Sequence, residues 1–347
     1  MTISDDDESV RLYEPHLANP ASKEYSNVKI TIQHWQLRDL VSCPDTSSQV
    51  YFVSDHVLRC LDTKTQKVTR AAHEFPFAPR SVRINHGLIC VGGGEDGQLC
   101  VNKLHDDLKR PPLFMELGGS INNSIFIWDR PCGTPGLLVS NNDKSIKLVD
   151  AHRWNMYGEL KFPTQINHSS VSTDGKMLVS VGDTSEVFLH NIDSSGAFHK
   201  GPVLQGTGEA AFATSFSPSS SEFAVASQDG VVAIYDTRNL GREMANIYST
   251  RPTRRSGAIR TLRYAPAPLD LLLFTEANGF AHLVCTRNRE KHQILRVPTA
   301  MPYRMRDIAG ACFSPDGHKV FVGTETGLVE WNIDTKARQC FPSRAPR

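Results

Sequence analysis

Short runs of β-forming residues, separated by turn residues, recur along most of the chain. In the clearest unit, apolar and alternating positions predict strands at Ala211–Phe216, Glu222–Ser227 and Val231–Tyr235. The last two strands flank Asp229-Gly230, where glycine supplies the positive φ that a tight hairpin turn requires. No convincing helical periodicity extends over more than about ten residues. The pattern therefore predicts an all-β protein built from repeated hairpins.

The turn residues set the length of the repeat. They are Asp55, Asp96, Asp143, Asp183, Asp229, Asn278 and Thr326. Their average spacing is about 45 residues, which matches a four-stranded unit of about 40–45 residues. Seven units of that length account for the chain from Gln33 to Arg347. We therefore predict seven sheets, each of four antiparallel strands.

The N-terminal end differs from these repeats. The first residues are polar and acidic without periodicity, which predicts a disordered arm over residues 1–26 and a single folded domain over residues 27–347. Asn27–Gln33 alternates like a strand. We expect it to complete the last sheet beside Gln339–Phe341 and so to remove the open edges of the ring.

Two segments, SFSPSSSEFAVASQDGVVAIYDTR and CFSPDGHKVFVGTETGLVEWNID, resemble repeats of the WD-repeat β-propeller family. The resemblance implies a seven-bladed propeller. The Gly-His dipeptide of that family is absent, and its Trp-Asp ending survives only in altered form, as in Tyr235-Asp236 and Trp331-Asn332. The segment TLRYAPAPLDLLLFTEANGFAHLVCTRN resembles part of uncharacterised fungal WD-repeat proteins. That family includes a member similar to a substrate receptor of the GID-type ubiquitin ligase.

Composition narrows the classes of function. Lys and Arg number 38 against 37 Asp and Glu, which argues against a dominant surface for a polyanion. No apolar stretch is long enough to span a membrane, and the N-terminus lacks the features of a signal peptide. The eight cysteines are scattered without any C-x-x-C pair, as expected of buried thiols in a reducing compartment. We predict a cytoplasmic and/or nuclear protein with no membrane partner.

Known catalytic motifs are missing. Residues Gly92–Gly97 satisfy G-x-G-x-x-G, but a strand-like segment follows where a dinucleotide site needs a helix, so we interpret them as a hairpin. There is no H-E-x-x-H, no zinc-ligand spacing and no G-x-S-x-G elbow. We predict a protein that is not an enzyme and binds no cofactor or metal. An active site assembled from several blades at the central channel remains an alternative.

Basic residues cluster at Arg251, Arg254, Arg255, Arg260 and Arg263. We interpret this run as a solvated loop or as a contact for an acidic partner. Binding to nucleic acid usually adds a longer basic stripe with aromatic side chains, so we do not predict it. Association with chromatin or RNA remains the third alternative.

Phe223–Arg238 resembles the sixteen-residue box of WD-repeat receptors for cullin-type ubiquitin ligases. In that family the final arginine contacts the adaptor. The resemblance therefore makes Tyr235, Asp236 and Arg238 candidate adaptor-binding residues, with the arginine offering a forked donor to partner acceptors. The alternative is that a good WD repeat reaches this sequence for hairpin reasons alone.

A second set of candidates is positional. Four residues before the end of each predicted first strand stand Arg38, Arg80, Ser124, Asn167, Phe212, Arg260 and Ala309. In propellers that this chain resembles, that position faces the upper mouth of the channel. We hypothesise that Arg38, Arg80, Asn167 and Arg260 bind an acidic or carboxylate-bearing peptide segment. The alternative is that the arginines pair internally with acids such as Asp39 and Asp307.

Together these observations predict a non-catalytic protein-interaction scaffold. Its most concrete form is a substrate receptor of a cullin-type or GID-type ubiquitin ligase.

Overall fold

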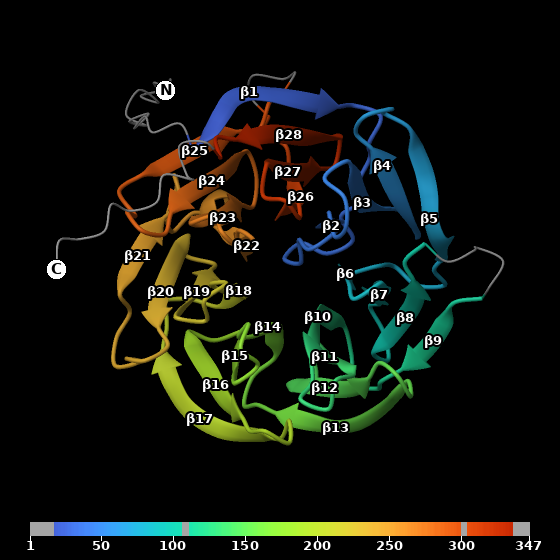
Figure 1. Ribbon diagram of the computed structural model, residues 1–347, viewed down its shortest axis with the longest axis vertical. Coiled ribbons are helices and arrows are strands. Elements are labelled where there is room, and N and C mark those ends of the chain that lie inside the picture. Colours follow the sequence, from blue (N-terminus) through green and yellow to red (C-terminus); the bar gives the residue numbers. More distant parts are fainter. Residues whose placement is uncertain (1–16, 106–110, 300–303, 336–347) are drawn as a thin grey trace, which may run out of the picture.

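Seven four-stranded antiparallel sheets surround a common axis in the computed structural model, as Figure 1 shows. The structure describes residues 17–105, 111–299 and 304–335. The predicted all-β class, the seven blades and the four strands of each blade are confirmed. Within the described ranges the one helical element is a short 3-10 turn, η1 (Arg255–Gly257). No helix in those ranges has the length and apolar character needed to cross a bilayer.

Each blade is a meander whose strands are given from the channel outwards. Blade 1 contains β2 (Val41–Ser42), β3 (Gln49–Ser54), β4 (Val57–Asp62) and β5 (Val68–Glu74); blade 2 contains β6 (Ser81–Asn85), β7 (Leu88–Gly92), β8 (Gln98–Lys103) and β9 (Leu113–Glu116). Blade 3 contains β10 (Asn122–Asp129), β11 (Pro135–Asn141), β12 (Ser145–Asp150) and β13 (Asn155–Lys161); blade 4 contains β14 (Ile166–Val171), β15 (Met177–Gly182), β16 (Glu186–Ile192) and β17 (Phe198–Gln205). Blade 5 contains β18 (Ala211–Phe216), β19 (Glu222–Ser227), β20 (Val231–Asp236) and β21 (Ala245–Tyr248); blade 6 contains β22 (Ile259–Tyr264), β23 (Leu271–Glu276), β24 (Phe280–Cys285) and β25 (His292–Arg296). Blade 7 contains β26 (Ile308–Phe313), β27 (Lys319–Thr324), β28 (Gly327–Ile333) and β1 (Ala18–Tyr25).

The strands nearest the channel and those at the rim differ in burial. Every residue of β14 is buried, whereas most residues of the outermost strand β13 are exposed or half-buried. The hairpin between β19 and β20 turns at Asp229-Gly230, where Gly230 has a φ of 78°. The inner three strands therefore carry the apolar pattern that the sequence shows, and the outer strands carry little of it.

Ring closure uses a different segment from the predicted one. Strand β1 pairs antiparallel with β28, so that Tyr25 lies opposite Leu328, and the two strands close the ring (Figure 1). This strand lies within residues 1–26, which the sequence assigned to a disordered arm. Its interior positions are exposed, so no apolar alternation marks it. The predicted strand Asn27–Gln33 is instead irregular, and the predicted partner Gln339–Phe341 lies outside the described residues.

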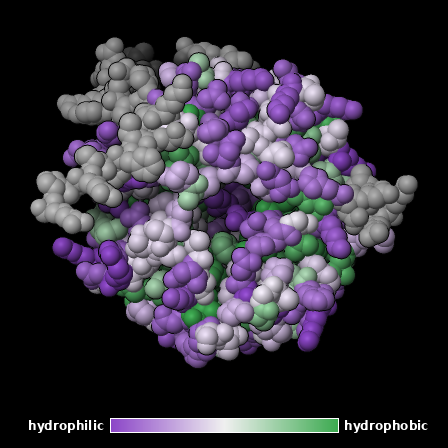
Figure 2. Space-filling model, in the orientation of Figure 1, coloured by the Kyte–Doolittle hydropathy of each residue, from purple (hydrophilic) through white to green (hydrophobic). Residues whose placement is uncertain are grey.

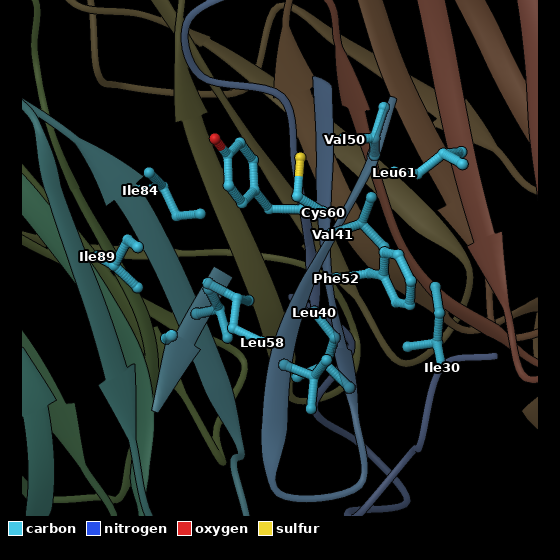
Figure 3. Close-up of a cluster of buried hydrophobic side chains, with 14 of the residues drawn as sticks. Ile30, Leu40, Val41, Val50, Phe52, Leu58, Cys60, Leu61, Ile84 and Ile89 are labelled. Atoms are coloured by element: carbon cyan, nitrogen blue, oxygen red, sulfur yellow. The ribbon is translucent and has the colours of Figure 1, made fainter. Parts of the chain in front are cut away.

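The alternation in Asn27–Gln33 has another cause. Val28 and Ile30 are buried in the largest apolar cluster, which joins blade 1 to blade 2. Figure 3 shows Ile30 beside Phe52 of β3, with Ile84 and Ile89 of blade 2 on the opposite side. The segment is therefore fixed by burial of alternate side chains against blade 1, and it leads the chain from the rim to the channel.

Candidate functional site

The innermost strands of blades 3 to 7 each carry one extra residue near their start. The register slips at these positions, which are Asn123, Asn167, Phe212, Arg260 and Ala309. A β-bulge of this kind re-aims one side chain. Four of the five line one cavity at the mouth of the channel, Ala309 being the exception. The bulge residue of blade 3 is therefore Asn123, one position before Ser124, which the sequence count had assigned to the mouth. Both residues line the cavity.

The three predicted arginines converge on His34. Burial lowers the pKa of His34, and the charges of Arg80, Arg38 and Arg260 lower it further, in that order. All three guanidinium groups therefore act on one imidazole. The face drawn in Figure 2 is hollowed at its centre, and the residues visible deep in the hollow are hydrophilic.

Arg260 is the most deeply buried of the three. Its side chain is 6% exposed, and its Nε and Nη1 have no hydrogen-bond partner within the described ranges. Burial lowers its pKa to about 9, and the charge of Arg38 adds to this. The guanidinium lies 4.2 Å from the ring centre of Phe212 and 5.8 Å from that of Trp35. Its contacts are thus aromatic faces rather than an anion.

Arg38 is partly satisfied by the backbone, whereas Nε and Nη1 of Arg80, like those of Arg260, have no hydrogen-bond partner among the described residues. Arg38 is 7% exposed and donates from Nη1 to the backbone oxygens of His34 and Leu37, but its Nε has no partner within the described part of the chain. Arg80 is half-buried. Its side chain lies against Gly94, and a Cβ added to Gly94 would be 3.1 Å from the Nε of Arg80. Burial lowers the pKa of both arginines.

The side-chain amide of Asn167, the fourth predicted mouth residue, is hydrogen-bonded to other residues of this chain. Its Nδ2 donates to Asp183 at 2.8 Å and to the backbone oxygen of Ala211 at 3.1 Å. Asn123 makes the matching bond to the backbone oxygen of Ile166 at 2.9 Å. These amides join blade 3 to blade 4 and blade 4 to blade 5, so Asn167 positions neighbouring blades at the mouth.

The predicted internal pairing of the mouth arginines is not what the structure contains. Asp39 instead pairs with Arg263, deeper in the channel. Burial opposes ionisation of Asp39, but Arg263, Arg83 and His168 together hold its pKa below the usual range. The charges of Asp307 and Glu325 raise the pKa of Arg38, but neither acid forms an ion pair with it. Among the described residues, none of Arg38, Arg80 and Arg260 forms an ion pair.

Sequence reasoning missed the segment that crosses the mouth. Blade 1 has a two-residue inner strand, and the residues before it carry Trp35, whose side chain is 62% exposed. Ala309 and Gly310 of blade 7 make room for this segment, since a Cβ at Gly310 would meet the Arg38 backbone oxygen at 3.1 Å. Thr261 of blade 6 donates to that same oxygen at 3.0 Å.

The predicted adaptor residues lie elsewhere, at the end of β20. Tyr235 is 1% exposed and stacks on Phe223 at 5.0 Å, so it belongs to the core of blade 5. Arg238 is exposed, and its guanidinium donates to both oxygens of Asp236, at 2.9 and 2.7 Å. These bonds from Arg238 lower the pKa of Asp236 to about 2. At this turn the hydrogen bonds of Asp236 and Arg238 are made to each other, and Arg238 is exposed to solvent.

Mouth and adaptor residues lie on opposite faces of the ring. The first and third strands of a blade run in the same direction, because each is antiparallel to the second. Arg260 is at the start of a first strand, whereas Arg238 follows the end of a third strand. Start and end of these strands point to opposite faces, so the two candidate surfaces are separated by the thickness of the propeller.

A second buried charge cluster lies inside blade 6. Glu276 is fully buried and accepts from Thr250 (N at 2.6 Å and Oγ1 at 2.7 Å), from Arg251 at 2.9 Å and from His282 at 3.1 Å. His282 in turn contacts His292 at 2.8 Å. Over the part of the chain that the structure describes, no group of three or more side chains has the geometry to hold a metal ion.

Comparison with known proteins places the chain in a family. A family described as an uncharacterised protein domain (DUF2415) matches residues 257–296, which cover blade 6 and Arg260. The uncharacterized protein C4G3.03 of Schizosaccharomyces pombe is 34% identical over 338 residues, covering 94% of this chain and 95% of that protein. The chain belongs to the family of this fission yeast protein. A second member, the uncharacterized protein YLR149C of Saccharomyces cerevisiae, is 26% identical over 84% of this chain, which spans 56% of its length.

Solved structures agree on the fold of this family. A chain of the mitotic checkpoint complex matches with a TM-score of 0.70 at 15% identity, covering 93% of this chain and 98% of that one. The WD40 β-propeller domain of Doa1 matches with a TM-score of 0.68 at 14% identity, covering 92% and 100%. The predicted WD-repeat propeller is therefore confirmed. WD40 propellers are typically non-catalytic and bind other proteins.

Proposed function

We propose that this family member is a non-catalytic scaffold that acts as a substrate receptor of a ubiquitin ligase, of the cullin type or the GID type. A client binds at the arginine mouth formed by Arg38, Arg80 and Arg260 through an acidic peptide segment. The ligase binds on the opposite face, at the exposed Arg238.

The observation that carries this proposal is the separation of two different basic surfaces. The mouth is recessed and contains arginine N–H groups without partners. The Arg238 surface is open, and its arginine is held in one orientation by Asp236. A receptor needs two surfaces that can be occupied at once, and opposite faces of a rigid ring meet that need. Six of the described cysteines (Cys43, Cys60, Cys90, Cys100, Cys132 and Cys312) are free thiols, which fits action in the reducing cytoplasm or nucleus.

Affinity purification with mass spectrometry tests the proposal. Wild type is compared with an Arg80→Gln/Arg260→Gln variant, with Arg238→Ala, and with Arg296→Ala as a control on the exposed outer strand of blade 6. We expect the mouth variant to lose client proteins and keep ligase subunits. Arg238→Ala loses ligase subunits and keeps clients, and the control loses neither.

Two results would overturn the proposal. One is a wild-type purification without ligase subunits. The other is loss of the same proteins in both variants, because that would indicate one surface instead of two. Circular dichroism of each variant first establishes that the propeller is folded.

A further inference from the structure

The floor of the arginine mouth is a small polar cavity. It is lined by Arg38, Arg260, Ser124, Asn167 and Phe212 together with deeper channel residues, and its volume is about 20 Å³. A cavity of this size holds one or two water-sized groups, since one such group needs roughly 10–15 Å³. The cavity is therefore of the size that the two oxygens of a carboxylate occupy.

Hydrogen-bond donors around this cavity outnumber the acceptors offered to them. Arg260 Nε and Nη1, Arg38 Nε and Ser124 Oγ are buried without a hydrogen-bond partner among the described residues. Arg260 and Arg38 are each more than nine-tenths buried. Leaving a charged donor buried and unpaired costs far more than pairing it. The cavity is thus built as the receiving half of a charge pair.

No carboxylate of the described residues forms an ion pair with Arg260 or Arg38, although Asp39 lines the cavity and the charges of Asp307 and Glu325 act on Arg38. Asp39 is bonded to Arg263, and Asp183 accepts from Asn167. The charges that act on Arg260 include Arg38, which opposes it, and no carboxylate. Within the described residues, Arg260 therefore lacks the anionic half of a charge pair.

We propose that the cavity binds a single carboxylate, that of an acidic side chain in a partner's peptide segment, and that Arg260 and Arg38 are its two ligands. This inference rests on the proposed function, since it names the chemistry that the same mouth recognises. Bonds from two guanidinium groups to one carboxylate are charge-assisted and short, and they are strongest where water is excluded.

Trp35 determines which kind of residue stands next to the acidic residue in the bound peptide. Its ring is 62% exposed, lies 5.8 Å from the Arg260 guanidinium and stacks on His34 at 6.3 Å between ring centres. A peptide whose carboxylate reaches Arg260 passes over this ring. An exposed indole beside a buried charge favours an apolar or aromatic side chain. The ligand class is therefore an acidic residue adjacent to an apolar one.

Selection from a phage-displayed library of random dodecapeptides tests the proposal on the purified full chain, with no ligase present. We expect wild type to enrich peptides with one invariant Asp or Glu next to an apolar residue. Arg260→Gln loses that enrichment. Arg296→Gln, which removes an exposed arginine of the same blade, keeps it.

Affinity then measures the single carboxylate. For a selected peptide with blocked ends, replacing the acidic residue by its amide weakens binding to wild type by at least about thirtyfold, as loss of one buried charge partner does. The same replacement has no effect on binding to Arg260→Gln. Arg260→Lys, which keeps the charge but not the fork, recovers only part of the affinity.

Three outcomes would overturn the proposal: peptides without an acidic position, acidic peptides that bind wild type and Arg260→Gln equally, or selection that appears only after Asp5→Asn/Asp6→Asn/Asp7→Asn/Glu8→Gln. The last would mean that the chain's own acidic N-terminal sequence is the ligand. Acidic selection without ligase subunits in the purification would leave this inference standing and remove the ligase role.

Discussion

Arg251 and Arg260, nine positions apart in the sequence, are both shielded arginines, but their surroundings are opposite. Arg251 donates to Glu276, which is fully buried and also accepts from Thr250 and His282. Arg260 is more deeply buried and has no acid. The first arginine is satisfied by the chain itself and holds the blade together. The second is left incomplete at a surface, which is what a binding site requires.

The largest expected effect is in the satisfied cluster. Burial opposes ionisation of Glu276, but bonds from His282, Thr250 and Arg251 hold its pKa below the ordinary value. Glu276→Gln removes the charge and leaves the part-buried Arg251 without its carboxylate partner, so we expect a loss of about 3–5 kcal/mol in the free energy of unfolding. Urea denaturation measures it. Glu290→Gln, an exposed acid of the same blade, should change it by less than about 0.5 kcal/mol.

His168 reports the positive charge deeper in the channel. Burial lowers its pKa to about 3, and Arg263 and Arg83 lower it while Asp39 opposes them. The unfolded chain binds a proton below about pH 6.5 and the folded chain does not, so this residue reduces stability as the pH falls towards 3. The loss is about 1.4 kcal/mol per pH unit, or about 2 kcal/mol between pH 6.5 and pH 5.

Denaturation of His168→Asn at those two pH values measures this contribution. The variant should lose about 2 kcal/mol less than wild type between them. Equal losses in both proteins would mean that His168 is protonated in the folded state and that the channel is less positive than the contacts imply.

Tyr25 is a second case of a buried polar group whose partner lies within the chain, here where β1 and β28 close the ring. Its hydroxyl donates to Glu330 at 2.8 Å, and Lys319 contacts the other Glu330 oxygen at 2.8 Å. Tyr25→Phe removes one donor to a buried carboxylate that keeps its other partner, so we expect a cost of about 1.5 kcal/mol. Tyr248→Phe, on an exposed outer strand, should leave the thermal midpoint unchanged. Equal midpoints for both variants would show that the Tyr25 bond does not stabilise the closure.

The inner strands could be predicted from the sequence because they are buried and therefore consist largely of apolar residues. Strands β18 and β19 have the predicted bounds, and β20 ends one residue later than predicted. Strand β1 was assigned to an arm because six of its eight positions are exposed. Val28 and Ile30 gave a strand-like alternation through burial alone. An exposed edge strand such as β1 is held by backbone hydrogen bonds, which any side chain allows, so its residues show no strand pattern.

The site was predicted in part, for a related reason. Counting back from the strand end found Asn167 and Arg260, because the bulge occurs at a constant distance from the strand end in their blades. The same count found Arg38 and Arg80, which come just before the inner strands of blades 1 and 2, where the register does not shift. It failed in blade 3, where β10 is longer and Asn123 takes the place assigned to Ser124. Trp35 could not be found in this way, because it lies on a segment that blade 1 has in place of a full inner strand.

The stability of Arg260→Met tests the central claim most directly. An arginine that stabilises the fold is costly to remove, whereas an unpaired buried charge kept for a ligand is not. We expect the variant to unfold in urea with a free energy equal to that of wild type or up to about 2 kcal/mol higher, because an apolar side chain of similar length replaces a buried charge without a partner. A loss of about 2 kcal/mol or more would contradict the account, since it would show that Arg260 is already satisfied within the chain.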